Sequence, residues 1–250
     1  MSERTELWLQ CLRPRREARQ RLVCFPHAGG SASFFRAWGD HLPGSEVHAV
    51  RYPGRAERIQ EPVPTDLVRL ARDVADVLES FGDRPLALFG HSMGAVVALE
   101  TARALEARGV RVTHLFASGS REGDCPPPVA DEDFPEDFPG DDAATIARLI
   151  ELGGTDPELA ADPDFQELVL PYIRGDSRMF HAYEFRPLPT LRCPVTTIVG
   201  DADGDADRRP WSMLTEGGFR EHVVPGDHFY LIDAPPYALI AEVLDGVTVR

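Results

Sequence analysis

The sequence predicts an α/β fold with a mostly parallel sheet that helices cover on both faces. Short apolar runs alternate along the chain with longer segments of helical periodicity, the pattern of successive strand–helix units. Strands joined in this way indicate parallel pairing. The chain has 250 residues, 43% of them hydrophobic, which suffices for one domain with a sizeable core over residues 1–250.

Six short apolar runs are the predicted strands. They are Leu22–Phe25, Val47–Tyr52, Pro85–Phe89, Val112–Ala117, Pro194–Val199 and Glu221–Val224. Between them, Asp66–Phe81 places its apolar residues on one helical stripe, and Met93–Arg108 is an Ala-rich helix that ends at Gly109. A last helix is predicted over Pro235–Leu244.

Residues 120–187 interrupt this alternation and are predicted to be a lid inserted over the edge of the sheet. Helical patterns occur around Ala143–Leu152 and Asp164–Tyr183. Residues 122–165 carry fourteen acids against one arginine, and we expect the acidic, Pro-rich loop Asp131–Asp142 to be solvated and mobile. This segment is expected to be an insertion in the same domain rather than a second folding domain, and no internal repeat is visible.

Composition excludes several functions. The net charge of −15 argues against nucleic-acid binding. The chain has no lysine, which excludes Schiff-base and pyridoxal phosphate chemistry and a P-loop. No run of 18 apolar residues predicts a membrane span, and the charged segment Met1–Arg21 lacks the apolar centre of a secretory signal. The four scattered cysteines fit a reduced, cytoplasmic setting.

The stretch GHSMG presents Ser92 as a candidate nucleophile. It matches G-x-S-x-G, in which the serine occupies a sharp strand-to-helix turn and small residues avoid collisions with neighbouring backbone. The motif alone is weak, because a tight turn that happens to hold a serine has the same pattern. Here a predicted strand precedes it and the helix beginning at Met93 follows it, which favours the nucleophile.

A serine needs a base, and His228 is the candidate. It lies in PGDHFYL after the last predicted strand, where loops meet ligands in open α/β sheets. His181 falls in a helical pattern and His222 inside a strand, so both are expected to be structural. His91 adjoins Ser92, but neighbouring side chains at a turn point apart, and we expect it to pack or hydrogen-bond locally.

The orienting acid is expected in GDADGDADRRP, after the strand Pro194–Val199. This loop holds Asp201, Asp203, Asp205 and Asp207, and the residues alone do not decide among them. Four close aspartates also resemble a calcium loop, but glycine and glutamate are missing at its sixth and twelfth positions from either Asp201 or Asp203. We therefore expect no metal.

An oxyanion hole requires two backbone N–H groups aimed at the developing negative charge. One is expected from Met93, the residue after the nucleophile, and the other from Ala28 in PHAGGSAS (Pro26–Ser33). Taken alone, this segment could be a flexible Gly/Ser loop. Because it follows an early strand, it lies where the plan of an α/β-hydrolase needs a donor.

Five stretches together resemble the type II thioesterases that accompany polyketide synthases and nonribosomal peptide synthetases. They are FPHAGGSASFFRAW, VRYPGRAER, FGHSMGA, GDAD and PGDHFYL, in the order and spacing of that family. The resemblance spans nearly the whole chain and implies an α/β-hydrolase fold. It also implies hydrolysis of acyl thioesters on the phosphopantetheine arm of acyl or peptidyl carrier proteins, without a cofactor.

The resemblance also assigns roles to residues. Ser92, His228 and Asp203 correspond to the catalytic triad, with Asp203 at the end of G-x-x-D, and Ala28 and Met93 to the oxyanion hole. The family often has proline where this chain has Gly204, and glycine where it has Asp227. The first departure bears on Asp203, with Asp201 as the alternative.

Substrate contacts are predicted at His27, Phe34, Met179, Phe180 and Tyr183. Helical spacing makes the last three equally compatible with the core of the lid. Because carrier proteins of such systems are usually acidic, we also hypothesise that the carrier docks on the more basic N-terminal part.

This docking hypothesis concerns Arg51, Arg55 and Arg58, for which plain surface solubility is the alternative. Two other functions remain open for the chain. One is a general serine esterase or lipase, and the other is a catalytically inactive hydrolase fold that serves as a binding module.

Overall fold

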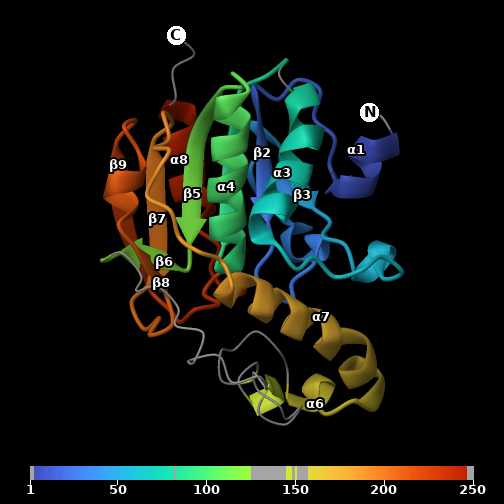
Figure 1. The fold of residues 1–250 in the computed structure, drawn as a ribbon. Coiled ribbons are helices and arrows are strands. Elements are labelled where there is room, and N and C mark those ends of the chain that lie inside the picture. The colour runs from blue at the N-terminus through green and yellow to red at the C-terminus, as the bar shows by residue number, and fades with distance from the viewer. Residues whose placement is uncertain (1–2, 82, 125–144, 148–149, 151–156, 247–250) are drawn as a thin grey trace.

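The computed structural model describes residues 3–81, 83–124, 145–147, 150 and 157–246, and a twisted sheet forms its centre (Figure 1). Within these residues the sheet has the strand order β1-β3-β2-β4-β5-β7-β9. The strands are β1 (Leu9–Gln10), β2 (Gln20–Phe25), β3 (Ser45–Val50), β4 (Leu86–His91), β5 (Val112–Ser118), β7 (Val195–Gly200) and β9 (Phe219–Val224). Only β1 runs antiparallel to its neighbour in this sheet. The carboxyl ends of the parallel strands therefore share one edge.

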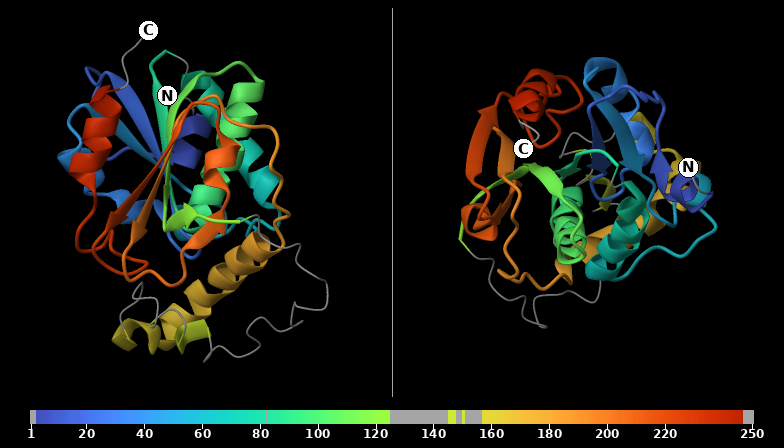
Figure 2. Two further views of the ribbon diagram at one scale, coloured as in Figure 1. Left: turned by 90° about the vertical axis from the view of Figure 1, so that its left-hand side faces the viewer. Right: turned by 90° about the horizontal axis from the view of Figure 1, so that it is seen from above.

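Helices cover both faces of the sheet (Figure 2). The elements on one face are α1 (Glu3–Trp8), α3 (Leu67–Leu78) and α4 (Met93–Ala107), and those on the other are α2 (Trp38–His41) and α8 (Tyr237–Gly246). A hydrophobic core lies on each face of the sheet, and side chains of strand β2 contribute to both. Val23 and Phe25 pack beneath α3 and α4, whereas Leu22 and Cys24 pack beneath α2 and α8, because successive side chains of a strand face opposite sides.

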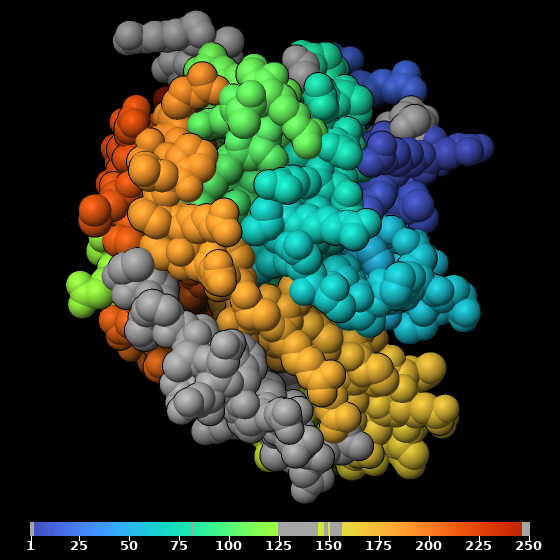
Figure 3. Space-filling view, in the orientation of Figure 1, coloured from blue at the N-terminus to red at the C-terminus, as the bar shows by residue number. Residues whose placement is uncertain are grey.

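The remaining elements lie mostly at loops around the sheet. They are η1 (Ala32–Phe35), η2 (Ala56–Arg58), η3 (Glu79–Phe81), β6 (Ser120–Glu122), α6 (Pro157–Ala160), α7 (Pro163–His181), β8 (Asp207–Arg209) and η4 (Trp211–Leu214). Strands β6 and β8 pair in parallel as a separate small sheet. Helix α7 crosses the carboxyl edge of the main sheet, and its outer side forms part of the surface there (Figures 1 and 3).

The predicted parallel α/β architecture is confirmed, and all six predicted strands are present within a few residues. The strand predicted over Val47–Tyr52 lies earlier, at Ser45–Val50, so Arg51 and Tyr52 begin the following loop. Helix α1 and the two-residue strand β1 were not predicted, because they are too short to carry a periodic signal. In the predicted lid, α7 matches the pattern around Asp164–Tyr183, while the acidic loop lies outside the described residues.

Candidate active site

Ser92 stands at a strained turn between β4 and α4. Its φ of 55° and ψ of −124° fall outside the regions that L-residues normally occupy. The turn is held on both sides: the Ser92 N–H donates to the carbonyl of Ser118 at 2.8 Å, and the Ser92 carbonyl accepts from Ala95 N–H at 2.8 Å. Strain of this kind persists where the surroundings over-determine the backbone, and it is common at active sites.

The two glycines of the motif are required by close backbone approaches. A Cβ on Gly90 would lie 2.1 Å from the carbonyl oxygen of Gly94. A Cβ on Gly94 would lie 2.2 Å from the carbonyl oxygen of Phe25, at the end of β2. The first turn of α4 is thus pressed against the loop that follows β2, as the G-x-S-x-G pattern predicts.

His228 and Asp203 are joined by a hydrogen bond between Nδ1 and Oδ2 of 2.9 Å. The Asp203 side chain is fully buried, and its other oxygen accepts from Asp205 N–H at 3.0 Å. A Cβ on Gly200 would lie 2.3 Å from the carbonyl oxygen of Gly226, so glycine lets the Asp203 and His228 loops meet. This contact fixes one ring nitrogen of His228 and leaves Nε2 for chemistry.

The other acids near these loops have different partners. Asp201 is exposed and accepts from the Gly226 N–H at 2.9 Å, and Asp227 accepts from the N–H two residues on, that of Phe229, at 2.8 Å. Asp207 pairs with Arg209 at 2.7 Å, and burial raises its pKa. Each of these carboxylates therefore bonds to the backbone or to an arginine, and among the described residues the side-chain partner of His228 is Asp203.

His91 packs beside His228, with 5.0 Å between ring centres. Its Nδ1 is 2.9 Å from Ser118 Oγ, which in turn is 2.7 Å from the hydroxyl of Tyr230, so the expectation of a local hydrogen bond is confirmed. Burial and the neighbouring His228 and His27 hold the pKa of His91 well below its usual range. His91 is therefore neutral at pH 7 and serves to fix the turn around Ser92.

Both candidate oxyanion donors lie just after the carboxyl end of a strand, Ala28 after β2 and Met93 after β4. Met93 begins α4, and the first N–H groups of a helix have no partner within it. Ala28 lies in a turn closed by a 2.9 Å hydrogen bond from Gly30 N–H to the carbonyl of His27. Among the described residues, the Ala28 N–H donates to no acceptor. Gly29, with φ of +76°, has the positive φ that the third position of a type II turn requires.

A cavity of about 640 Å³ opens beside Ala28 and lies between α7 and the segments that follow β2 and β9. His27 and Phe34 line it, as predicted, together with Phe229. From α7 it receives four apolar or aromatic side chains, which were not predicted. They are Phe165, Val169, Tyr172 and Ile173. Their spacing of i, i+4, i+7 and i+8 is a helical stripe, and this signal was present in the sequence.

The three lid residues predicted to contact substrate lie elsewhere. Met179 is buried in the core beneath α3 and α4, and Phe180 and Tyr183 pack against that core. The Tyr183 hydroxyl donates to Glu100 of α4 at 2.6 Å, and Arg209 lies over the rings of Phe180 and Tyr183. None of the three lines the cavity in the described structure, and they pack with the main hydrophobic core rather than with a separate core of the lid.

His27 lines the cavity, and its ring centre lies 5.8 Å from that of His91, the residue before Ser92. Its ring makes edge-on contacts with Phe34 and Phe229 at 4.8 and 4.9 Å. Burial, with the nearby charges of His228 and Arg55, lowers the pKa of His27 to about 3. At neutral pH it therefore presents an uncharged wall to the cavity.

The arginines proposed to dock a carrier are mostly buried, which contradicts that hypothesis for two of them. Arg55 and Arg58 are 2% and 4% exposed. Arg58 forms a two-pronged contact with Glu61 at 2.6 and 2.5 Å, and Arg55 pairs with Asp176 of α7. Arg51 is partly exposed. Arginine side chains with such partners are structural. A docking surface for a carrier protein would need other arginines, whose guanidinium groups are exposed.

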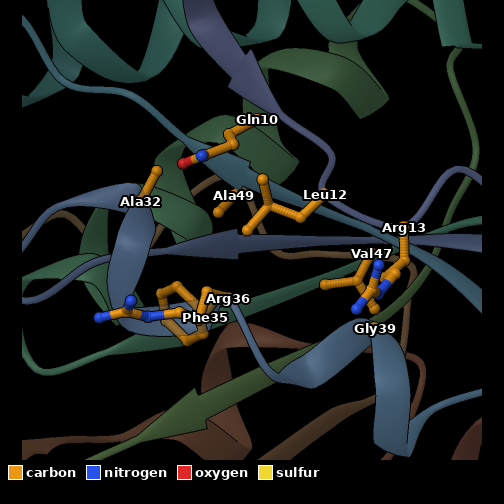
Figure 4. A pocket seen from close by; sticks show the side chains of 9 residues that line it. All are labelled: Gln10, Leu12, Arg13, Ala32, Phe35, Arg36, Gly39, Val47 and Ala49. Atoms are coloured by element: carbon orange, nitrogen blue, oxygen red, sulfur yellow. The ribbon is translucent and has the colours of Figure 1, made fainter. Parts of the chain in front are cut away.

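Two other features of the described structure are poorly suited to bind a ligand. The small depression in Figure 4, between η1 and the β1–β3 edge, has a volume of about 10 Å³, room for little more than a water molecule. Among the described residues, Cys11, Glu46 and His48 bring possible metal-ligand atoms within 4.8 Å of one another. Glu46, however, pairs with Arg21 and Arg84, whose positive charges disfavour a cation there.

Comparison with known proteins identifies the family. The thioesterase domain family model matches residues 20–245. Thioesterase PikA5 of Streptomyces venezuelae is 40% identical over 233 residues, which cover 91% of this chain and 81% of the relative.

No helix in the described residues has the length and apolar character to cross a membrane.

Solved structures agree. The type II thioesterase BorB from the borrelidin biosynthetic cluster superposes with a TM-score of 0.79 at 35% identity, covering 95% of this chain and 98% of BorB. YbtT, a type II thioesterase from the yersiniabactin NRPS/PKS biosynthetic pathway, gives 0.80 at 32%, covering 96% and 98%. The chain therefore belongs to the thioesterase family, as an α/β-hydrolase that acts on thioesters and whose structural neighbours are type II thioesterases.

Proposed function

We propose that this thioesterase hydrolyses acyl groups from the phosphopantetheine arm of carrier proteins in polyketide or nonribosomal peptide synthesis, and so removes aberrant or stalled chains. Two structural neighbours support this setting, since YbtT is described as part of an NRPS/PKS biosynthetic pathway and BorB as part of the borrelidin biosynthetic cluster. The observation that carries the chemistry is the 2.9 Å hydrogen bond that His228 Nδ1 donates to Asp203 Oδ2, near the strained turn at Ser92. These three residues form the proposed triad.

In the proposed acylation step, Ser92 Oγ attacks the thioester carbonyl carbon as His228 Nε2 takes its proton. Asp203 holds His228 Nδ1, which selects the tautomer with Nε2 free and stabilises the imidazolium that forms. The N–H groups of Ala28 and Met93 bind the oxyanion, and removal of one such donor typically costs about a hundred- to thousandfold in rate. The C–S bond then breaks, and the leaving thiolate takes the proton that His228 Nε2 holds, which returns His228 to its neutral form.

Deacylation repeats the same chemistry with water. His228 accepts a proton from a water molecule that attacks the acyl-Ser92 ester, the oxyanion forms in the same hole, and collapse releases the acid while Ser92 regains its proton from His228. Because a thiolate leaves readily, the enzyme has little need to protonate the leaving group in the first step. No cofactor takes part in either step.

The cavity between α7 and the turn at Ala28 is the proposed acyl site. Its wall combines Phe34, Val169, Tyr172 and Phe229, which favours an apolar chain over a charged one. His27 remains uncharged at this boundary, since its pKa is about 3. An acyl chain in this cavity therefore meets His27 as an uncharged ring.

The test compares substrates on wild type and Ser92→Ala. We expect a carrier-bound or pantetheine thioester to be hydrolysed with a much higher kcat/KM than the p-nitrophenyl ester of the same acid, and Ser92→Ala to lose both activities. A preference for the oxygen ester would favour the general esterase. No turnover, and no labelling of Ser92 by a fluorophosphonate, would favour the binding module.

A further inference from the structure

A buried ion pair joins α7 to the loop after β3. The Nη1 and Nη2 atoms of Arg55 donate to Oδ2 and Oδ1 of Asp176 at 2.5 and 2.6 Å. The two side chains are 2% and 1% exposed, and the guanidinium lies against the rings of Tyr52 and Tyr172. Burying two charges is costly even when they pair, so such a pair is weak evidence of a purely stabilising role.

The same carboxylate reaches the turn that carries Ala28. Asp176 Oδ2 also accepts from the Gly29 N–H at 2.8 Å, and Arg55 Nη1 donates to the carbonyl of Gly30 at 3.1 Å. The Gly29 N–H belongs to the central peptide of the turn His27–Gly30. Type I and type II turns differ by a flip of this peptide, so Asp176 holds it in one orientation.

Close packing restricts the backbone on both sides of the Arg55–Asp176 pair. A Cβ on Gly29 would lie 2.6 Å from Cγ1 of Ile173, which is nearly one helical turn before Asp176 on α7. On the other side, the residues that flank Arg55 have positive φ, at +82° for Gly54 and +46° for Ala56. For Ala56 this conformation is strained, and it persists where the surrounding contacts fix the backbone.

We propose that Arg55 and Asp176 are positioning residues of the oxyanion hole. Asp176 holds the Gly29 N–H, which fixes the turn and leaves the preceding N–H, that of Ala28, directed at the developing oxyanion. Arg55 neutralises Asp176 and holds the far end of the turn through Gly30. This inference rests on the proposed function, and it gives the RYPGR segment a role in catalysis that does not require surface exposure.

Two double variants isolate the hydrogen bond to Gly29. Arg55→Met/Asp176→Leu replaces the pair by apolar groups of similar size, which often preserves stability, but it offers no acceptor. Arg55→Met/Asp176→Asn also removes both charges and retains a carbonyl oxygen for Gly29. We expect the Leu variant to lower kcat for a pantetheine thioester by about ten- to a hundredfold relative to wild type. If the loss is about a hundredfold, the Asn variant should have a kcat at least about tenfold higher than the Leu variant, since a neutral hydrogen bond suffices to hold the peptide.

Binding of a transition-state analogue separates positioning from mere stability. Affinity for an alkyl trifluoromethyl ketone, which forms a tetrahedral adduct, should fall by the same factor as kcat, while KM changes by less than about threefold. The control is Arg58→Met/Glu61→Gln, which removes the other two-pronged pair of the same loop without touching the turn. It should keep the wild-type kcat and inhibitor affinity.

The outcomes distinguish this inference from the proposed function. If wild type neither hydrolyses the thioester nor labels at Ser92, the proposed function fails. If wild type is active, equal kcat and inhibitor affinity in the Leu variant, or no gain in the Asn variant, would overturn the role of Asp176. Should the Leu variant not fold, amide exchange of wild type decides: a protected Gly29 N–H supports the inference and a rapidly exchanging one contradicts it.

Discussion

Asp203 and His228 meet through a single hydrogen bond, from Nδ1 to Oδ2 at 2.9 Å, although 25 residues separate them in the chain. Asp201, two residues earlier, faces solvent and braces Gly226 instead. These two aspartates therefore have different partners, and substituting each by asparagine should separate their contributions to catalysis.

Asp203→Asn should leave the fold intact and lower kcat by up to about ten-thousandfold, because an amide favours the wrong tautomer of His228. Asp201→Asn should cost about tenfold at most, since an asparagine oxygen can still accept from Gly226. Steady-state kinetics with a pantetheine thioester, and melting temperatures as the control for folding, measure both effects. The opposite order of the two variants would assign the acid to Asp201.

The cavity wall on α7 predicts control of chain length. Val169 lines the cavity, whereas its neighbour Leu168 is 59% exposed. Val169→Trp should fill part of the space and exclude several methylenes of a long acyl chain. At about 0.8 kcal/mol per CH₂, three excluded groups lower kcat/KM by about fiftyfold.

The comparison is made with acyl-pantetheine thioesters of increasing chain length. A short acetyl group should be hydrolysed by Val169→Trp as well as by wild type, and Leu168→Trp should behave like wild type with every chain. A uniform loss across all chain lengths would show that position 169 does not limit the acyl site.

Much of the fold and part of the candidate site follow from local sequence patterns. The six strands are short apolar runs with clear boundaries, α4 is a longer Ala-rich segment, and G-x-S-x-G and G-x-x-D place Gly90, Gly94 and Gly200 where backbones approach closely. A close backbone approach of this kind requires glycine at a particular position, so a short sequence motif can predict it.

Contacts between distant segments are not encoded in this way. Arg55 was expected at the surface, yet its partner Asp176 lies 121 residues away, and a charged residue is buried only when such a partner exists. Likewise, the periodicity of α7 shows that one side is apolar but not whether that side meets core or cavity. For this reason the prediction selected Met179 and Phe180, and the cavity is lined by Val169 and Tyr172.

Buried neutral histidines predict loss of stability in acid. Burial and the nearby charge of Arg220 lower the pKa of His114 to about 4, from about 6.5 in the unfolded chain. Between these values the unfolded state binds more protons than the folded state, so stability rises with pH and falls on acidification. At pH 5 this residue alone costs about 2 kcal/mol relative to pH 8.

Replacing His114 by glutamine should therefore reduce the loss of unfolding free energy between pH 8 and pH 5, whatever its effect at neutral pH. Urea denaturation at several pH values measures the slope, and His41→Gln, at an exposed position, is the substitution control. An unchanged slope in the His114 variant would mean that another group dominates the acid response.

Arg36 is an exposed arginine beside the candidate site and is suited to recognise the proposed carrier. It lines the cavity at the carboxyl edge of the sheet, where the phosphopantetheine arm would enter in the proposed reaction, and a guanidinium pairs well with a phosphodiester. Arg36→Glu should raise KM for a carrier-bound substrate by about tenfold, an effect that weakens at high salt. It should leave KM unchanged for a pantetheine thioester that lacks the phosphate.

The matched control is Arg19→Glu, because Arg19 is exposed at the opposite end of β2. This variant should leave KM for both substrates unchanged. An equal rise in KM for both substrates would instead assign Arg36 to the acyl cavity, and no change for either would exclude it from carrier recognition.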